Sequence, residues 1–501
     1  MLNLIKNELE KQKNTSITEN GAIGYKSTNS ALVDINYQVS SLRNSSEEEI
    51  IKLFDNCFHE NNEYALKWLF FARDVRGGLG ERRLFRICYK RLLELNKDLF
   101  ILNLKNISEY GRWDDLISLL GISKITDDVI INMVKNQLNS DISAKLLNEP
   151  ISLLAKWLPS ENASSKKTKE MGKFVRKSLG LSSRKYRVLL SELRNYLNVV
   201  EVKMCANEWN DIDYDKVPSL ANLKYSNAFL KHDKDRRVSY LDSVRCGKSK
   251  MNMGVATPVD IVSKYNNSYY NVSDFDDSLE LAWKNLKDIS VQDTLVVADG
   301  SGSMTLPVSH NITALDVANA LAIYTSEHNN GIYKDKYITF SNTPQFVDLS
   351  NDESLRSKLI TSREHSEISN TNIEAVFRLI LNVAVENNIP KSEMIKNILI
   401  ISDMEFDEAQ RSWKSNEVLS EPLFNMIKKE YENNGYKLPK LIFWNVNSRT
   451  KTIPLIENDL GVVLVSGFSQ NVLKMVMSNK LNPYDVLIET ITSERYDKII
   501  V

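Results

Sequence analysis

The chain has 501 residues, of which 42% are hydrophobic and 26% charged, with a formal net charge of −1 at pH 7. These values are typical of a globular protein with two or three domains, and they exclude a uniformly basic or acidic chain. Four cysteines without CxxC spacing favour free thiols. No apolar core of signal-peptide length and no apolar run of about 18 residues is present. We therefore expect a cytoplasmic protein with no membrane partner.

The first half of the chain has a helical pattern. Residues 1–45 are polar and turn-rich and predict an N-terminal arm. Residues 46–246 predict an all-helical domain, a HEAT-like or irregular α-solenoid, although no repeat period is evident. The expected helices are 47–59, 63–73, 81–95, 114–120, 127–139, 143–147, 151–157, 168–179, 183–197 and 239–244.

The second half alternates between strand and helix patterns. Residues 247–290 predict a linker with a helix at 275–286. Residues 291–479 predict a doubly wound, mostly parallel sheet. Its expected strands are 294–298, 336–340, 345–349, 396–401, 440–445 and 461–466, and its helices are 314–328, 353–360, 373–387, 407–434 and 471–477. Residues 480–501 predict a C-terminal helix at 484–492 and a tail that packs on the body.

Oxygen-bearing side chains follow two of the buried strands. Asp299, Ser301 and Ser303 form an Asp-x-Ser-x-Ser turn after the first strand, and Asp403 follows the strand at 396–401. Thr371 precedes a helix between them. Open α/β sheets bind ligands at the carboxyl ends of their strands, and hard oxygen ligands suit Mg²⁺ or Mn²⁺. The alternative is a capped strand-to-helix turn, because Asp and Ser are common turn residues.

The order of these segments resembles the metal-ion-dependent adhesion site of von Willebrand factor A (vWA) domains. The resemblance implies a vWA domain that binds one Mg²⁺ or Mn²⁺ through Asp299, Ser301, Ser303, Thr371 and Asp403. It also implies a protein partner that supplies an acidic side chain to the metal. One departure precedes Thr371, where Ser369-Asn370 replaces the glycines of many vWA domains.

A basic stretch in the helical half predicts contact with a nucleic-acid backbone. Its candidate residues are Lys166, Lys167, Lys169, Lys173, Arg176, Arg184, Lys185 and Arg187. Arg73 and Arg76 flank a glycine-containing corner that precedes a helix, and its backbone N–H groups are candidates for phosphate binding. The alternatives are a solvated helix face for the basic stretch and a helix–helix corner with Arg–Asp pairs for the glycine-containing segment.

The whole chain resembles the domain of unknown function 2828 family, in which a helical region precedes a vWA domain. The resemblance depends on segments 71–78, 110–115, 155–160, 402–407 and 465–469. In architecture the chain also resembles the Ro/TROVE ribonucleoproteins, which bind small structured RNAs and the ends of misfolded RNAs. This likeness implies an RNA partner.

Little in the sequence indicates catalysis. The five histidines have no metal-ligand spacing, and no nucleophile motif is evident. Our interpretation is a non-catalytic protein that binds RNA through its helical domain and a divalent metal through its vWA domain. One alternative is a vWA assembly module that uses the metal to capture a partner carboxylate. A weaker alternative is a metal-dependent hydrolase, which the acids Asp403, Glu405, Asp407 and Glu408 would serve. The simpler account of these acids is a solvated loop near one Mg²⁺.

Overall fold

The structure is a computed structural model that describes residues 2, 14–268, 271–309, 312–367, 369–408 and 421–501. The chain divides into two compact units. A sheet unit comprises Met1–Trp68 and Ala256–Glu494, and a helical unit comprises Leu69–Val255 and Arg495–Val501. This division differs from the sequence-based one, because residues 46–68 group with the sheet and the last seven residues, 495–501, group with the helices.

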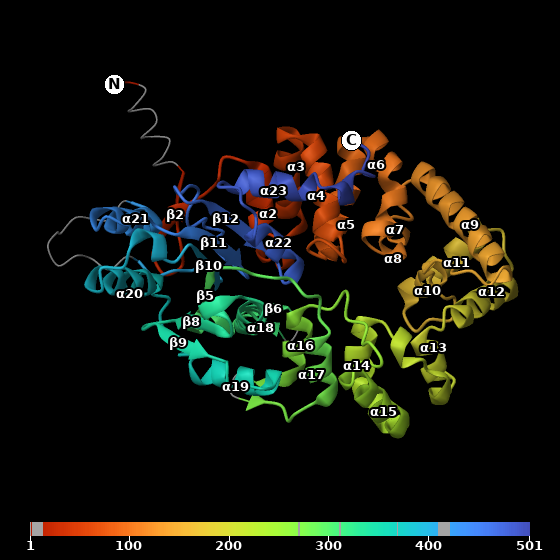
Figure 1. Ribbon diagram of the computed structural model, residues 1–501. Coiled ribbons are helices and arrows are strands. Elements are labelled where there is room, and N and C mark those ends of the chain that lie inside the picture. Colours follow the sequence, from red (N-terminus) through yellow and green to blue (C-terminus); the bar gives the residue numbers. More distant parts are fainter. Residues whose placement is uncertain (1, 3–13, 269–270, 310–311, 368, 409–420) are drawn as a thin grey trace. The chain divides into compact units, whose positions relative to one another are not determined.

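The sheet unit is built on a six-stranded sheet (Figure 1). Its strands are β5 (Thr294–Asp299), β8 (Lys336–Phe340), β9 (Gln345–Asp348), β10 (Asn397–Ser402), β11 (Lys440–Asn445) and β12 (Val462–Ser466). They lie in the order β12-β11-β10-β5-β8-β9, and all pairs are parallel except β8 with β9. Counted along the chain this is the 3-2-1-4-5-6 order of doubly wound folds. The prediction of a doubly wound, mostly parallel sheet is confirmed.

Helices pack on this sheet and on one another. They are α16 (Pro258–Tyr265), α17 (Asp277–Lys284), α18 (Ala314–Glu327), α19 (Leu355–Glu364), α20 (Ile373–Glu386), α21 (Leu423–Asn433), α22 (Leu473–Val476) and α23 (Pro483–Ile491). The most deeply buried is α18, which contacts β5, β8 and β10. Small side chains such as Ala318 and Ala322 allow this close approach. Within the range expected as a helix at 407–434, Asp407 is not helical and α21 begins at Leu423; residues 409–420 lie outside the described range.

The predicted N-terminal arm forms a hairpin and then helices. Strands β1 (Thr15–Ile17) and β2 (Ile23–Tyr25) pair antiparallel, and α2 (Ala31–Tyr37), α3 (Glu47–Glu60) and α4 (Asn62–Arg73) follow. The hairpin bridges to the rest of the sheet unit at two places, Gly21 to Asp407 and Tyr25 to Ile453. Gly24 permits this approach, because a Cβ there would lie 2.6 Å from the carbonyl oxygen of Ile453. Two-stranded pairs β3–β4 (Asn266–Ser268, Asn271–Val272) and β6–β7 (Pro307–Ser309, Ile312–Thr313) complete the unit.

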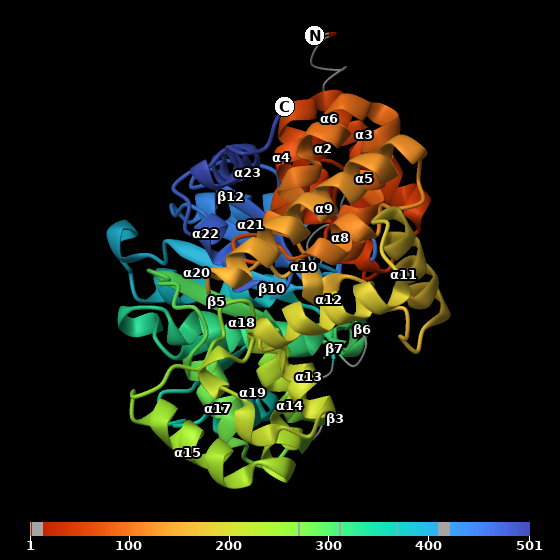
Figure 2. The same ribbon diagram turned by 90° about the vertical axis from the view of Figure 1, so that its right-hand side faces the viewer.

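The helical unit confirms the expected all-helical region. Its helices are the end of α4, then α5 (Arg82–Leu95), α6 (Lys97–Asn103), α7 (Ile107–Tyr110), α8 (Trp113–Ile117), α9 (Lys124–Leu146), α10 (Leu154–Trp157), α11 (Lys166–Ser178), α12 (Ser183–Tyr196), α13 (Val200–Cys205), α14 (Ser219–His232) and α15 (Lys234–Arg245). Helices α9, α10 and α12 pack against one another (Figure 2). Among the described residues, no helix has the length and apolar character needed to cross a membrane.

One expected helix break is wrong. The segments 127–139 and 143–147 form the single helix α9, which continues through Asp141. The buried Asp141 carboxylate accepts hydrogen bonds from the Gln137 amide at 2.8 Å and from the backbone N–H of Ser152 at 3.0 Å. Because these tertiary bonds satisfy Asp141, a residue that usually favours caps and turns is tolerated inside a helix.

Candidate functional site

Two buried carboxylates lie at the carboxyl ends of neighbouring parallel strands. Asp299 is the last residue of β5 and is 1% exposed, and Asp403 directly follows β10 and is 0% exposed. These strands pair with each other, and the chain order of the sheet reverses between them. Doubly wound sheets bind ligands at this switch point, so the two aspartates lie where the fold positions a site.

The Asp-x-Ser-x-Ser turn holds its hydroxyls together. The backbone N–H of Ser301 donates to Oδ1 of Asp299 at 2.9 Å, and the hydroxyl oxygens of Ser301 and Ser303 are 3.2 Å apart. On the other side, the Asp299 Oδ2 accepts from the hydroxyl of Ser402 at 2.5 Å. The turn is therefore tied to the strand end that carries Asp403.

Thr371 lies on a third loop that is bonded to the other two. The N–H of Gly302 donates to the carbonyl of Ser369 at 3.2 Å. The N–H of Thr371 donates to the Asp407 carboxylate at 3.0 Å, and Thr371 itself is 1% exposed. Asn370 does not have a positive φ, so its position in this loop does not require glycine. The structure thus brings the three predicted ligand loops together at one edge of the sheet.

The electrostatics of this edge are dominated by buried acids. Burial and the charge of Asp403 raise the pKa of Asp299, although hydrogen bonds from Ser402 and Ser301 oppose the shift. Asp403, Asp299 and Glu405 are all at most 1% exposed. Among the described residues, Arg449 is the one cationic side chain in contact with any of the three, at 2.8 Å from Asp403. A divalent cation suits this set, since buried charge requires compensation and the donors are hard oxygens.

The chemistry of the donor set decides which metals fit. Across the described ranges, no three His, Cys, Asp or Glu side chains converge as a metal site of that kind requires. The candidate centre instead combines two carboxylates with three hydroxyls, which suits Mg²⁺ or Mn²⁺ better than a softer ion.

Sequence reasoning missed Arg449 and Asn20 and placed Glu405 wrongly. Glu405 was expected on a solvated loop, but it is 0% exposed. Its carboxylate accepts from the backbone N–H groups of Arg449 at 2.7 Å, Thr450 at 2.9 Å and Glu19 at 2.9 Å. Asn20 donates to the hydroxyl of Thr371 at 3.2 Å. The polar segment after the buried strand β11 was the available sequence signal for Arg449.

The predicted basic stretch lies on α11, α12 and the turn between them. Its exposed members are Lys166, Lys167, Lys169, Lys173, Arg184, Lys185 and Arg187. Within the described part of the chain, none of these seven forms an ion pair with a carboxylate. Arg176 differs, because its guanidinium is bound to Glu161 at 2.7 Å and to the carbonyl of Leu181 at 2.8 Å. These seven residues form the basic face of α11 and α12, and Arg176 is not part of it.

The two arginines of the glycine-containing corner have different surroundings. Arg73 is 2% exposed and pairs with the fully buried Asp115 at 2.7 Å. Arg76 is exposed, and its guanidinium donates to the carbonyl of Glu109 at 2.8 Å. Arg86 completes the network by bonding the second oxygen of Asp115 at 2.7 Å. Arg73 therefore lies inside the unit and joins helices, as the alternative of an Arg–Asp corner predicts.

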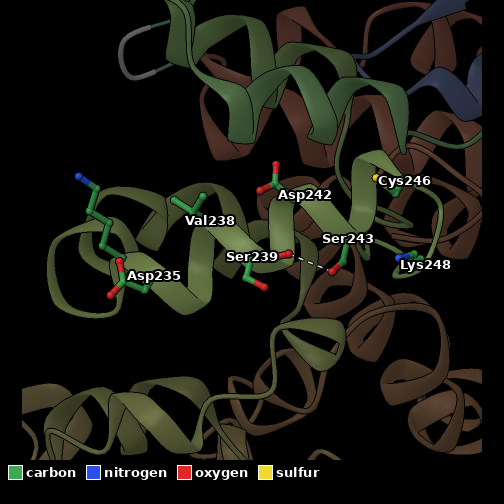
Figure 3. A pocket seen from close by; sticks show the side chains of 8 residues that line it. Asp235, Val238, Ser239, Asp242, Ser243, Cys246 and Lys248 are labelled. Atoms are coloured by element: carbon green, nitrogen blue, oxygen red, sulfur yellow. Dashed lines mark hydrogen bonds between the residues drawn. The ribbon is translucent and has the colours of Figure 1, made fainter.

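A hollow of about 490 Å³ lies beside α15 (Figure 3). Its lining is of mixed charge, with Asp235 and Asp242 opposed by Lys234 and Lys248. The neighbouring Arg237 is fully buried, with its guanidinium 5.2 Å from the ring centre of Tyr214. The charged side chains that line the hollow are two acidic and two basic, so their charges balance.

Two family models match consecutive parts of the chain. A family model described as a domain of unknown function, DUF2828, matches residues 18–141 and 167–295. A second, DUF7788, also of unknown function, matches residues 293–496. The chain belongs to the DUF2828 family. The boundary between the two matches falls at the start of β5, the strand that ends in Asp299.

One relative matches nearly the whole chain. An uncharacterized protein, L728, of Acanthamoeba polyphaga mimivirus is 31% identical over 518 residues, which covers 95% of this chain and 87% of the relative. Among solved structures, the crystal structure of the Deinococcus radiodurans Ro (RSR) protein is similar, with 12% identity, 92% and 93% coverage of the two chains and a TM-score of 0.35. Because that score is below 0.5, the family assignment depends on the sequence matches.

Proposed function

We propose that this protein is a non-catalytic binding protein that binds RNA through its helical unit and a divalent cation through its sheet unit. The observation that supports RNA binding is the set of exposed basic side chains on α11 and α12, none of which forms an ion pair with a carboxylate within the described part of the chain. Exposed lysines and arginines release counterions when they contact phosphates, and this is the main source of affinity for nucleic-acid backbones.

The proposal takes Lys166, Lys167, Lys169, Lys173, Arg184, Lys185 and Arg187 as phosphate contacts. It leaves out Arg73 and Arg176, because their guanidinium groups are bound within the unit. Arg76 remains an exposed candidate. Contacts with phosphates carry no sequence information, so we expect affinity with little sequence preference.

The full-length protein tests this proposal in anisotropy titrations with a labelled structured RNA and a labelled single strand. We expect the combined substitution Lys166→Glu, Lys167→Glu, Arg184→Glu and Arg187→Glu to weaken binding at least about tenfold and to flatten the dependence on salt by about 0.7 per lost contact. The matched control reverses four exposed lysines elsewhere in the unit, Lys97, Lys105, Lys124 and Lys135. Equal effects of the two sets, or none, would remove the basic face from the interface.

For the sheet unit we propose that Asp299, Ser301, Ser303, Thr371 and Asp403 hold Mg²⁺ or Mn²⁺, directly or through water. The support is the excess of buried carboxylates over cationic partners among the described residues. A bound ion would supply an electrophilic position for one further oxygen ligand. Calorimetry with Mg²⁺ and Mn²⁺ tests this, and Ser301→Ala with Ser303→Ala is expected to abolish binding while RNA affinity is retained.

A second function for the sheet unit is capture of an acidic side chain from a protein partner. The observation that favours it is Arg449, whose guanidinium already binds a carboxylate, that of Glu19, beside the candidate centre. Metal-dependent association that is lost in EDTA would support capture by the ion itself.

A further inference from the structure

Arg449 joins two carboxylates of contrasting exposure. One terminal nitrogen is 2.8 Å from Oδ2 of Asp403, which is 0% exposed. Its Nε and its other terminal nitrogen contact Oε2 of Glu19 at 2.8 Å and 2.7 Å. The Glu19 side chain is 48% exposed and that of Arg449 is 23% exposed. The guanidinium is therefore anchored to the interior on one edge, while its Nε edge faces a carboxylate at the surface.

The backbone that carries Glu19 is fixed independently of this ion pair. The Thr18 hydroxyl donates to the carbonyl of Phe406 at 2.7 Å, and Thr18 is 6% exposed. The N–H of Glu19 donates to Glu405 at 2.9 Å, and the carbonyl of Asn20 accepts from the N–H of Glu408 at 2.9 Å. Rotation of the Glu19 side chain away from Arg449 thus leaves the hairpin attached.

We propose that Arg449 is a carboxylate-recognition residue, and that an Asp or Glu side chain of a protein partner binds its Nε edge in place of Glu19. Glu19 is then an internal ligand that occupies the position until a partner arrives. This inference deepens the second proposed function and rests on it. It assigns the captured carboxylate to Arg449, a contact that does not require the metal.

The energetics favour exchange at Glu19 and retention at Asp403. An ion pair with a half-exposed glutamate contributes about 0–1 kcal/mol, whereas a buried aspartate deprived of its cation is costly. The planar fork of arginine matches a carboxylate better than the point charge of lysine does. Arg449 therefore retains its contact with Asp403, and its contact with Glu19 is the one that a partner carboxylate replaces.

The charges around Arg449 select a single carboxylate over a polyanion. Asp403 is bonded to Arg449 and the Glu405 carboxylate accepts from its backbone N–H, so each added negative charge is repelled. Exchange of Glu19 for another carboxylate leaves the local charge unchanged, but an RNA backbone adds several charges. The class of partner that fits is thus a protein segment with one well-placed acidic side chain.

A library of short random peptides displayed on phage tests this inference with the full-length protein. Peptides selected on the wild type are resynthesised and titrated by fluorescence anisotropy. We expect them to share one essential Asp or Glu. Glu19→Gln is expected to tighten binding about two- to fivefold, as loss of a competing exposed pair predicts. Arg449→Lys, which retains the positive charge near Asp403, is expected to weaken binding about tenfold.

Controls separate this inference from the function on which it rests. Glu408→Gln removes an exposed acid at the same edge. It is not expected to produce the tightening of about two- to fivefold that is expected of Glu19→Gln. Thermal melts establish that each variant is folded. Binding that survives EDTA and depends on Arg449 supports the inference. Acid-dependent binding that is lost in EDTA but is unchanged by Arg449→Lys overturns it while supporting capture by the metal. Selection of no peptide, or of peptides without an essential acid, overturns both.

Discussion

Arg495 and Asp74, which are 421 residues apart in the sequence, form a two-pronged ion pair in the helical unit. The terminal nitrogen of Arg495 is 2.7 Å from Oδ1 of Asp74, and its Nε contacts Oδ2. Asp74 is fully buried and also accepts from the hydroxyl of Tyr496 at 3.1 Å. The corner between α4 and α5, a candidate phosphate loop by sequence, therefore binds the C-terminal tail of the chain.

Arg495→Ala should destabilise the helical unit. The substitution leaves the Asp74 carboxylate buried with neutral donors, the Tyr496 hydroxyl and the Arg76 N–H, in place of its cationic partner. We expect a loss of about 2–3 kcal/mol, reduced from the fully buried case by the 40% exposure of Arg495. Urea denaturation measures this. Lys498→Ala is the matched control, because its pair with Glu109 is exposed and should contribute under about 1 kcal/mol. Equal losses in the two variants would show that the tail is not anchored through Asp74.

The sheet and its ligand loops were predictable because their signals are local. Each central strand is a short apolar run, and a polar residue such as Asp299 or Asp403 directly follows it. Since parallel strands align their carboxyl ends, the position of these residues in space follows from their position in the chain. Thr371 was placed in the same way, as a hydroxyl before a helix.

The remaining features depend on contacts that leave no local pattern. The hairpin tip at Asn20 bonds to Thr371, which is 351 residues further along the chain. The loop at Arg449 bonds to Asp403. Glu405 resembles a surface acid in the sequence, and its burial depends on backbone donors from three other positions. Likewise, Arg73 is a candidate phosphate contact by sequence, but the structure buries it because Asp115 compensates its charge.

The Asp115 carboxylate should be a main stabilising element of the helical unit. Asp115→Asn leaves Arg73, which is 2% exposed, without its partner, and we expect a loss of about 3–5 kcal/mol in urea denaturation. Asp114→Asn is the control, since Asp114 is 24% exposed and should contribute about 1 kcal/mol. RNA affinity of the folded Asp115→Asn protein should equal that of the wild type. A loss of RNA affinity in the folded Asp115→Asn protein would show that Arg73 belongs to the RNA interface.

Two neighbouring glycines should respond differently to alanine. A Cβ at Gly78 would lie 2.0 Å from the carbonyl oxygen of Phe71, so Gly78→Ala forces the corner apart and should cost about 3 kcal/mol or more. Gly80 has a φ of +77° with open space around it, so Gly80→Ala should cost only the backbone strain of about 1–2 kcal/mol. Thermal melts of the two variants make the comparison, and a larger loss for Gly80→Ala would contradict the packing of this corner.

Asp299→Asn should stabilise the metal-free protein at neutral and higher pH while removing its response to Mg²⁺. Burial and Asp403 raise the pKa of Asp299, so between the ordinary value near 3.9 and the raised value the folded state binds a proton that the unfolded state does not. The free energy of unfolding of the wild type therefore falls as pH rises through this window. Asparagine has no such proton, so the variant should lack this slope and gain about 2–4 °C in Tm at pH 8.

Magnesium should reverse which of the two proteins, the wild type or Asp299→Asn, has the higher Tm. A bound cation favours the ionised carboxylate, so wild-type Tm should rise with Mg²⁺ and lose part of its pH slope, whereas the Asp299→Asn protein should respond to neither. Asp288→Asn, at a side chain that is 90% exposed, controls for removal of one negative charge from the same unit. If wild-type Tm is unchanged at millimolar Mg²⁺ and Asp299→Asn is destabilised, Asp299 acts as a cap for the Ser301 turn, and the excess of buried carboxylates is tolerated without a metal.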